Sequence, residues 1–94
     1  MLGKRIVWDD RKDKANRAKH SIAFEDAANV FFDKLALTVA DADHSWDELR
    51  FVTIGSTSNR GTVIVFYTET DDEIRIISAR KPTRSERLSY EEKR

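Results

Sequence analysis

The sequence contains no cysteine, one proline and three glycines among its 94 residues. Without cysteine, the chain has no disulfide, iron–sulfur cluster or thiolate zinc site, and it has no cysteine nucleophile. This absence favours a reducing compartment, and we expect a cytoplasmic protein. With so few glycines, a glycine-rich phosphate loop is excluded, and the sequence has no nucleotide-binding, serine-hydrolase or metalloprotease motif.

Long apolar segments are also lacking. The uninterrupted apolar runs are only a few residues long, so we expect no membrane-spanning segment. The first residues show no apolar stretch of the kind that a secretory signal requires. Hydrophobic residues make up 39% of the chain, which is enough for a small folded core. The length predicts a single domain over residues 1–94.

The chain has no net charge, because 17 Lys and Arg residues balance 17 Asp and Glu residues. This balance excludes a uniformly basic nucleic-acid binder. The charges are segregated, however: basic residues predominate over 4–20 and 75–87, and acidic residues over 21–49 and 69–73. If the fold brings the two basic blocks together, one face suits phosphates and another suits a basic partner protein. The alternative is scattered surface charge that serves solubility.

Hydrophobic periodicity and turn residues predict eight elements. Strands are expected at 4–8, 35–40, 49–54, 62–68 and 74–80, and helices at 11–20, 24–32 and 84–92. The order β-α-α-β-β-β-β-α predicts an α+β fold, with a small antiparallel sheet, N-terminal helices and a C-terminal helix. We expect the helices on one face of the sheet and a ligand on the other, partly open face.

His20 is the best acid–base candidate, because histidine titrates near neutrality and this one ends a predicted helix. The alternative is a surface histidine that caps the last carbonyl groups of the helix. His44 lies among three aspartates, an arrangement that could suggest a metal site. Carboxylates in a polar loop are more often simply solvated, and we expect neither a metal nor another cofactor.

Arginines gather toward the end of the chain. Strict alternation along the last strand places Arg75 and Arg80 on opposite faces, so that only one of them reaches the active face, and the sequence leaves open which. Arg84 and Arg87 are three residues apart on the last helix and point the same way. Arginine binds phosphate bidentately, although such residues can also serve solubility.

Other strand residues are additional candidates. Glu48 and Arg50 share a strand face, as an ion pair or as a general base beside a phosphate ligand. Tyr67 and Tyr90 could stack on a base or donate a proton. A tyrosine in a strong strand is more often a core residue whose hydroxyl group is hydrogen-bonded.

Several motifs together resemble the BrnT family of toxins. They are Trp8-Asp9-Asp10, Asn16-x-x-Lys19-His20, Ile22-x-Phe24-Glu25-x-Ala27, Arg50-x-Val52-x-Ile54-Gly55 and the run from Ile74 to Arg80, followed by Thr83-x-x-Glu86-Arg87 and Tyr90-Glu91. The resemblance covers nearly the whole chain, and the motifs in this order are far more specific than any one of them.

The resemblance implies a toxin of a bacterial type II toxin–antitoxin system, with a fold like that of the RelE ribonucleases, that cleaves RNA and inhibits translation. It implies a partner similar to BrnA, a dimeric ribbon-helix-helix antitoxin that binds operator DNA, and a 2:2 complex by analogy. It assigns catalytic roles to Lys19, His20, Arg50 and Arg80, with Arg75 as a further candidate.

The sequence also departs from the family pattern. Ser21 replaces the usual glycine after Lys-His, which costs about 1 kcal/mol if that residue is left-handed. Ala23 replaces a serine that would cap the next helix, a loss of about 1 kcal/mol. Pro82 stands where alanine is usual.

Two functions are therefore carried forward. The first is a metal-independent endoribonuclease that uses attack by the RNA 2′-hydroxyl group, with Arg75, Arg84 and Arg87 binding backbone phosphates. The second is a catalytically inactive module that only pairs with an antitoxin, and the departures at Ser21 and Ala23 motivate it.

Overall fold

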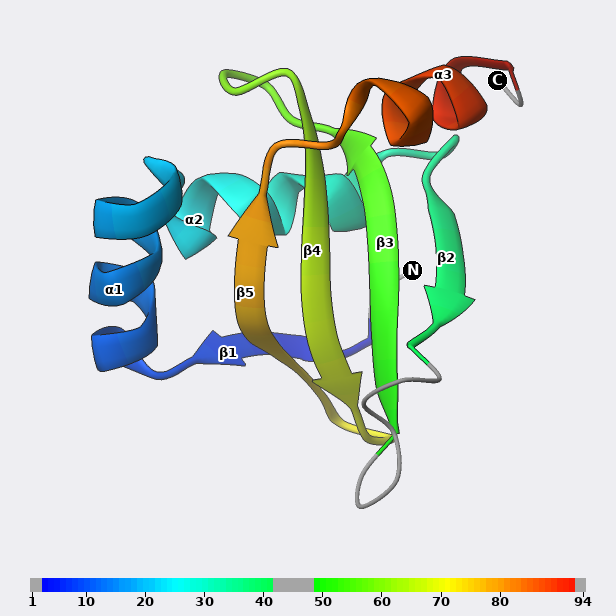
Figure 1. Cartoon of the computed structure of the whole chain (residues 1–94). Helices are drawn as coiled ribbons and strands as arrows, with labels where there is room; N and C mark the ends of the chain where they lie inside the picture. Colours follow the sequence, from blue (N-terminus) through cyan, green and yellow to red (C-terminus); the bar gives the residue numbers. More distant parts are fainter. Residues whose placement is uncertain (1–2, 42–48, 93–94) are drawn as a thin grey trace.

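The computed structural model describes residues 3–41 and 49–92. The elements are β1 (Arg5–Trp8), α1 (Asp10–His20), α2 (Phe24–Ala27), the 3-10 helix η1 (Ala28–Phe32), β2 (Leu37–Ala40), β3 (Arg50–Ser56), β4 (Thr62–Glu69), β5 (Glu73–Arg80) and α3 (Arg84–Glu92) (Figure 1). The predicted order and the α+β class are confirmed, with the second helix divided into α2 and η1. Within the described residues, no helix has the length and apolar character needed to cross a membrane.

The five strands form one sheet in the order β1-β5-β4-β3-β2. Strands β2 to β5 pair antiparallel, as predicted, whereas β1 pairs parallel to β5, so the sheet is mixed. Two ion pairs accompany this pairing: Lys4 with Glu69, and Arg5, which donates to Glu73 at 2.7 Å. The basic start of the chain therefore meets the acidic β4–β5 turn, a pairing between distant segments that local patterns do not reveal.

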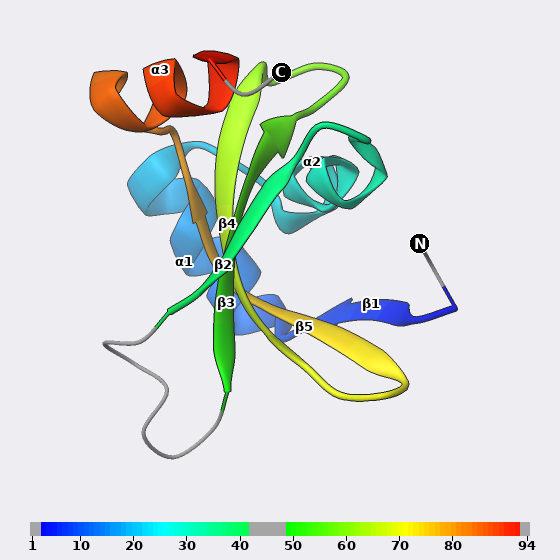
Figure 2. The ribbon, with the colours of Figure 1, turned by 90° about the vertical axis from the view of Figure 1, so that its right-hand side faces the viewer.

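The two faces of the sheet carry separate apolar clusters. On the first face, alternate residues of β4, among them Val63 and Val65, pack with Phe24 of α2 and Val30 of η1. On the second face, Ile54 and Ile64 pack against Tyr90 of α3. Figure 2 shows α2 and α3 on opposite sides of the sheet. The prediction that all helices share one face is wrong for α3, because its one buried residue, Tyr90, packs on the second face.

Asp33 anchors α3 at this end of the sheet. Its carboxylate accepts hydrogen bonds from the Tyr90 hydroxyl at 2.6 Å and from the Ser56 amide at 2.8 Å. Gly55 permits the close approach, because a Cβ atom there would lie 3.2 Å from Asp33 Oδ2 and 3.1 Å from Val30 Cβ. The α3 helix therefore covers one end of the second face and leaves the rest of that face for other groups.

An irregularity in β5 decides which arginines face the same way. Phe66 of β4 pairs with Ser78, but the next residue, Tyr67, pairs with Ile76, so Ile77 is an extra residue in β5. A bulge of this kind resets the alternation of side chains. Arg75 and Arg80 therefore lie on the same face of the sheet, and the prediction from strict alternation is wrong.

Candidate functional site

Helix α1 carries the histidine at its C-terminal end. The helix begins after Asp9, whose carboxylate accepts from the backbone amides of Arg11 and Lys12 at 2.7 and 3.3 Å. These hydrogen bonds, the first one foremost, hold the pKa of Asp9 below its ordinary value. The helix ends at His20, and Ser21 follows in the left-handed conformation with φ of 61°. The chain turns sharply here, which leaves His20 half-buried at the edge of the sheet.

Asn16 fixes α1 against β5. This buried amide donates to the carbonyl groups of Ile22 and Ala79, both at 2.9 Å, and accepts from the Ala79 amide at 3.1 Å and the Ser78 hydroxyl at 3.3 Å. One side chain thereby joins the helix, the turn after His20 and the strand. Asn16 precedes His20 by about one helical turn. These hydrogen bonds therefore fix the position of the helix end that carries the imidazole.

His20 lines a shallow hollow between α1 and β5, which we call the histidine hollow. Its lining residues are Lys12, Ala15, Asn16, Lys19, His20, Ile77 and Ser78. Three of these residues are basic in type and none is acidic. The imidazole is accessible from solvent and lies among ammonium groups, which suits proton transfer next to a phosphate.

A second hollow of about 330 Å³ lies on the second face of the sheet, and we call it the arginine hollow. Its lining residues are Lys12, Arg50, Thr68, Thr70, Glu73, Arg75 and Ile77. Arg50 of β3 and Arg75 of β5 both pair with Thr68 of β4, so they flank one position on one face. Glu73 is the single acidic residue among these seven, and it is paired with Arg5 at 2.7 Å and Arg75 at 3.8 Å. The remaining positive charge suits an anion.

The two hollows share Lys12 and Ile77. Helix α1 runs in the same direction as β5 (Figure 1), and it follows β1, whose last residue, Trp8, pairs with Ile76 in the middle of β5. Sequence reasoning did not single out Lys12. The available signal was its spacing of seven residues from Lys19, which puts both on one side of the helix.

Arg80 is engaged within the protein. Its guanidinium donates to both carboxylate oxygens of Glu86 at 2.9 and 3.1 Å and lies 5.4 Å from the centre of the Phe66 ring. The hydrogen bond from Arg80 is the main reason why the pKa of Glu86 falls to about 2, and the same contact raises the pKa of Arg80. Glu86 also accepts from the Thr83 amide at 2.7 Å, and its own amide donates to the Thr83 hydroxyl at 3.1 Å, so the two residues form a capping box at the start of α3. Arg80 thus joins the end of β5 to the first turn of α3.

Arg84 and Arg87 lie at the end of the sheet that α3 covers. With Arg60 and Lys81 they line a third hollow, which also includes Glu91. The structure therefore brings these two arginines together, but not with Arg50 and Arg75.

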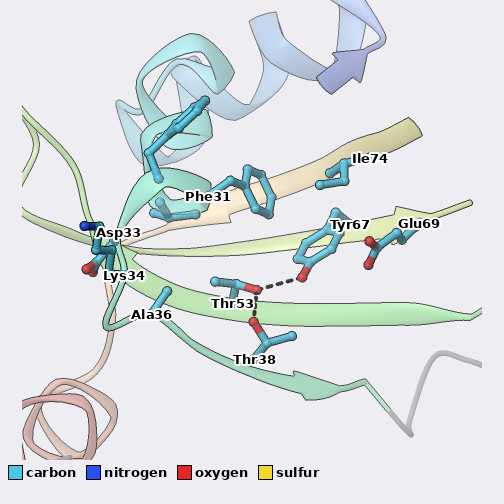
Figure 3. A pocket seen from close by; sticks show the side chains of 11 residues that line it. Phe31, Asp33, Lys34, Ala36, Thr38, Thr53, Tyr67, Glu69 and Ile74 are labelled. Atoms are coloured by element: carbon cyan, nitrogen blue, oxygen red, sulfur yellow. Dashed lines mark hydrogen bonds between the residues drawn. The ribbon is translucent and has the colours of Figure 1, made fainter. Parts of the chain in front are cut away.

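The tyrosines lie in the apolar clusters. The Tyr67 ring packs on Phe31, and its hydroxyl group is 2.7 Å from the hydroxyl group of Thr53. Tyr67 belongs to the first face, so it does not join Arg50 and Arg75 on the second face. Tyr90 is the buried residue of α3 and packs with Ile54 and Ile64 on the second face. Figure 3 shows Tyr67 in a pocket of about 540 Å³ beside η1, with its hydroxyl linked through Thr53 to Thr38. Glu48 and His44 lie outside the described residues.

Metal ligands do not gather in the part of the chain that the structure describes: no group of three His, Asp or Glu side chains there could hold an ion. The chemistry of the two hollows is that of an imidazole with ammonium and guanidinium groups.

Comparison with known proteins identifies the family of the chain. A family model described as ribonuclease toxin, BrnT, of type II toxin–antitoxin system matches residues 8–86. The chain belongs to the BrnT family of toxins. The crystal structure of the Brucella abortus ribonuclease toxin BrnT is similar, with a TM-score of 0.67 and 23% sequence identity over 86% of this chain and 99% of that one. No curated protein matches the chain in sequence.

Two of the departures from the BrnT pattern lie in the turn that follows His20. Ser21 is indeed left-handed, with φ of 61°, at the position where the family usually has glycine. Ala23 precedes α2 without a side-chain cap, but Asp13 of α1 accepts from the Phe24 amide at 2.9 Å. Asp13 therefore satisfies the first amide of α2, whereas a serine at 23 would cap the amide of Glu25 or Asp26. In this BrnT protein, the turn after His20 is held by hydrogen bonds from Asn16 to the Ile22 carbonyl group and from the Phe24 amide to Asp13.

Proposed function

We propose that this BrnT toxin is a metal-independent endoribonuclease and that it inhibits translation by cleaving RNA. The observation that carries the proposal is that His20 lies, accessible to solvent, in a hollow without acidic lining residues that adjoins the arginine hollow through Lys12. RNA supplies its own nucleophile, the 2′-hydroxyl group, so the protein has to move protons and stabilise charge.

In the proposed reaction the 2′-oxygen attacks the neighbouring phosphorus atom and loses its proton to a base. The bond from phosphorus to the 5′-oxygen breaks as that oxygen receives a proton, which leaves a 2′,3′-cyclic phosphate and a 5′-hydroxyl end. His20 carries out proton transfer, and Lys19 beside it orients the phosphate. Arg50 and Arg75 stabilise the charge that grows on the phosphate oxygens.

Arg80 has a more indirect part in this proposal. Because Glu86 holds its guanidinium bidentately, Arg80 shares its charge with a carboxylate and positions α3 beside the site. Arg84 and Arg87, on the third hollow, contact the RNA backbone farther from the reacting phosphate.

The family implies an antitoxin, and we propose that it is a dimeric, BrnA-like ribbon-helix-helix protein. In this proposal the two proteins form a 2:2 complex, and contact with operator DNA is made through the antitoxin alone. The lack of cysteine is in accord with a cytoplasmic site of action.

The proposal is tested by incubating the purified protein with RNA in excess EDTA and analysing the ends of the fragments. We expect cleavage with 2′,3′-cyclic phosphate ends, no cleavage of a DNA strand of the same sequence, and a loss of about 100- to 10,000-fold in rate for His20→Ala.

Tyr67→Phe is the control for this experiment, because Tyr67 lies on the other face of the sheet. It should cleave RNA as the unaltered protein does. Absence of cleavage in EDTA, together with no growth arrest on induction, would instead identify an inactive module that only pairs with an antitoxin.

A further inference from the structure

Lys12 lies where the histidine hollow and the arginine hollow meet. It is exposed on α1, and it is the one charged residue common to both sets of lining residues. The other shared residue, Ile77, is the extra residue of the β5 bulge. The bulge that turns Arg75 to the second face thus also places an apolar side chain between the two hollows.

The spacing of the cations along α1 is that of an extended ligand. Lys12 and Lys19 are seven residues apart, which is about two helical turns or roughly 10 Å along the axis. Two ammonium groups with this spacing can contact successive phosphates of an extended ligand. A polynucleotide backbone, with a phosphate at every nucleotide, fits this arrangement.

Charge in the two hollows agrees with this picture. Lys12 adds its charge to those of Arg50 and Arg75 on one side and to that of Lys19, next to His20, on the other. The one carboxylate on either lining, Glu73, is 2.7 Å from the guanidinium of Arg5, which lies outside the hollow, and 3.8 Å from that of Arg75. The line of positive charge therefore runs from the arginine hollow to the histidine hollow through Lys12.

We propose that Lys12 binds the RNA backbone at this junction, so that one strand lies along α1 and β5 and passes from the arginine hollow to the histidine hollow. The inference rests on the proposed function, since it assigns a path for the same substrate. It adds a phosphate ligand that neither the spacing of the motifs nor the resemblance supplied.

The test separates binding from cleavage by using an RNA in which every 2′-hydroxyl is methylated, which cannot undergo the reaction. Affinity is measured by fluorescence anisotropy at several salt concentrations for Lys12→Gln and for Lys14→Gln. Lys14 is the matched control, because it is exposed on the same helix, loses the same charge and lines neither hollow.

We expect Lys12→Gln to weaken binding and to reduce the slope of log K against log salt by about 0.7, the value for one lost phosphate contact on a single strand. Lys14→Gln should leave the slope unchanged, and Lys12→Arg should restore it.

Equal slopes for Lys12→Gln and Lys14→Gln would overturn the path, as would an unaltered protein that does not bind the methylated RNA. The proposed function fails on a different observation, which is absence of cleavage of unmodified RNA. A protein that binds RNA through Lys12 but does not cleave it would support the proposed RNA path and contradict the proposed ribonuclease activity.

Discussion

Arg50 and Arg75 flank Thr68 from the two neighbouring strands, with both side chains on the second face of the sheet. The pairing depends on the bulge at Ile77, without which Arg75 and Arg80 would face opposite ways. Two arginines that flank one position and line one hollow give this part of the face a chemistry suited to an anion. The site is built on strands, so its geometry is set by the backbone register.

Arg75→Gln should lower the rate of RNA cleavage by about 100-fold, because it removes one of two guanidinium groups that stabilise the transition state. Arg75 is exposed, so the free energy of unfolding should change little. The comparison is Arg11→Gln, an exposed arginine of α1 that lines neither hollow. The measurement is the initial rate of fragment formation, and equal rates for both variants would count against the arginine hollow.

Asn16→Ala should reduce the free energy of unfolding by roughly 2–3 kcal/mol, because it leaves the buried amide and carbonyl groups of Ala79 without the side chain that satisfies them. Urea denaturation followed by circular dichroism measures the change. Asn59→Ala is the control, since Asn59 is exposed and makes one hydrogen bond to Asp26. A loss for Asn16→Ala no larger than for Asn59→Ala would show that Asn16 does not hold α1 on the sheet.

Glu86 should make the free energy of unfolding depend on pH. The pKa of its carboxyl group is about 2 in the folded chain and 4.5 as an ordinary value, so its contribution is complete above pH 4.5 and disappears as the pH falls toward 2. We expect Glu86→Gln to be less stable than the unaltered protein at pH 6, and the difference to shrink steadily below pH 4.5. Denaturation midpoints of both proteins between pH 6 and pH 3 check this, and a constant difference would contradict it.

Ser21→Gly should stabilise the protein by about 0.5–1 kcal/mol, because glycine adopts the left-handed conformation without a steric cost. The same substitution at Ser89, inside α3, should have the opposite sign and a similar size. Thermal unfolding of the two variants measures both. A Ser21→Gly variant that is no more stable than the unaltered protein would show that serine is unstrained there.

The order of elements was predictable because it depends on local signals. The β-branched and aromatic residues of β4, the helical spacing of Phe24, Ala27 and Phe31, and the Thr83–Glu86 capping box each act over a few residues. The motif order identified the family for a similar reason, since it is written directly in the chain. The same comparison of motifs pointed to position 21 as a place where glycine is usual, and the structure showed that the residue there is left-handed.

The partners of β1 and α3, the face of Arg75 and the role of Lys12 were decided only by tertiary structure. β1 pairs with β5 across most of the chain, and Tyr90 reaches Asp33 through a contact that Gly55 permits. Ile77 is the extra residue of the β5 bulge, and it reverses the face on which the side chains of the preceding residues of β5 lie. The hydrophobic periodicity of the sequence does not show where a bulge occurs. Sequence by itself determined which elements form and which family they belong to, because those follow from neighbours along the chain. The structure decided which charges meet, because that depends on register and packing between residues far apart.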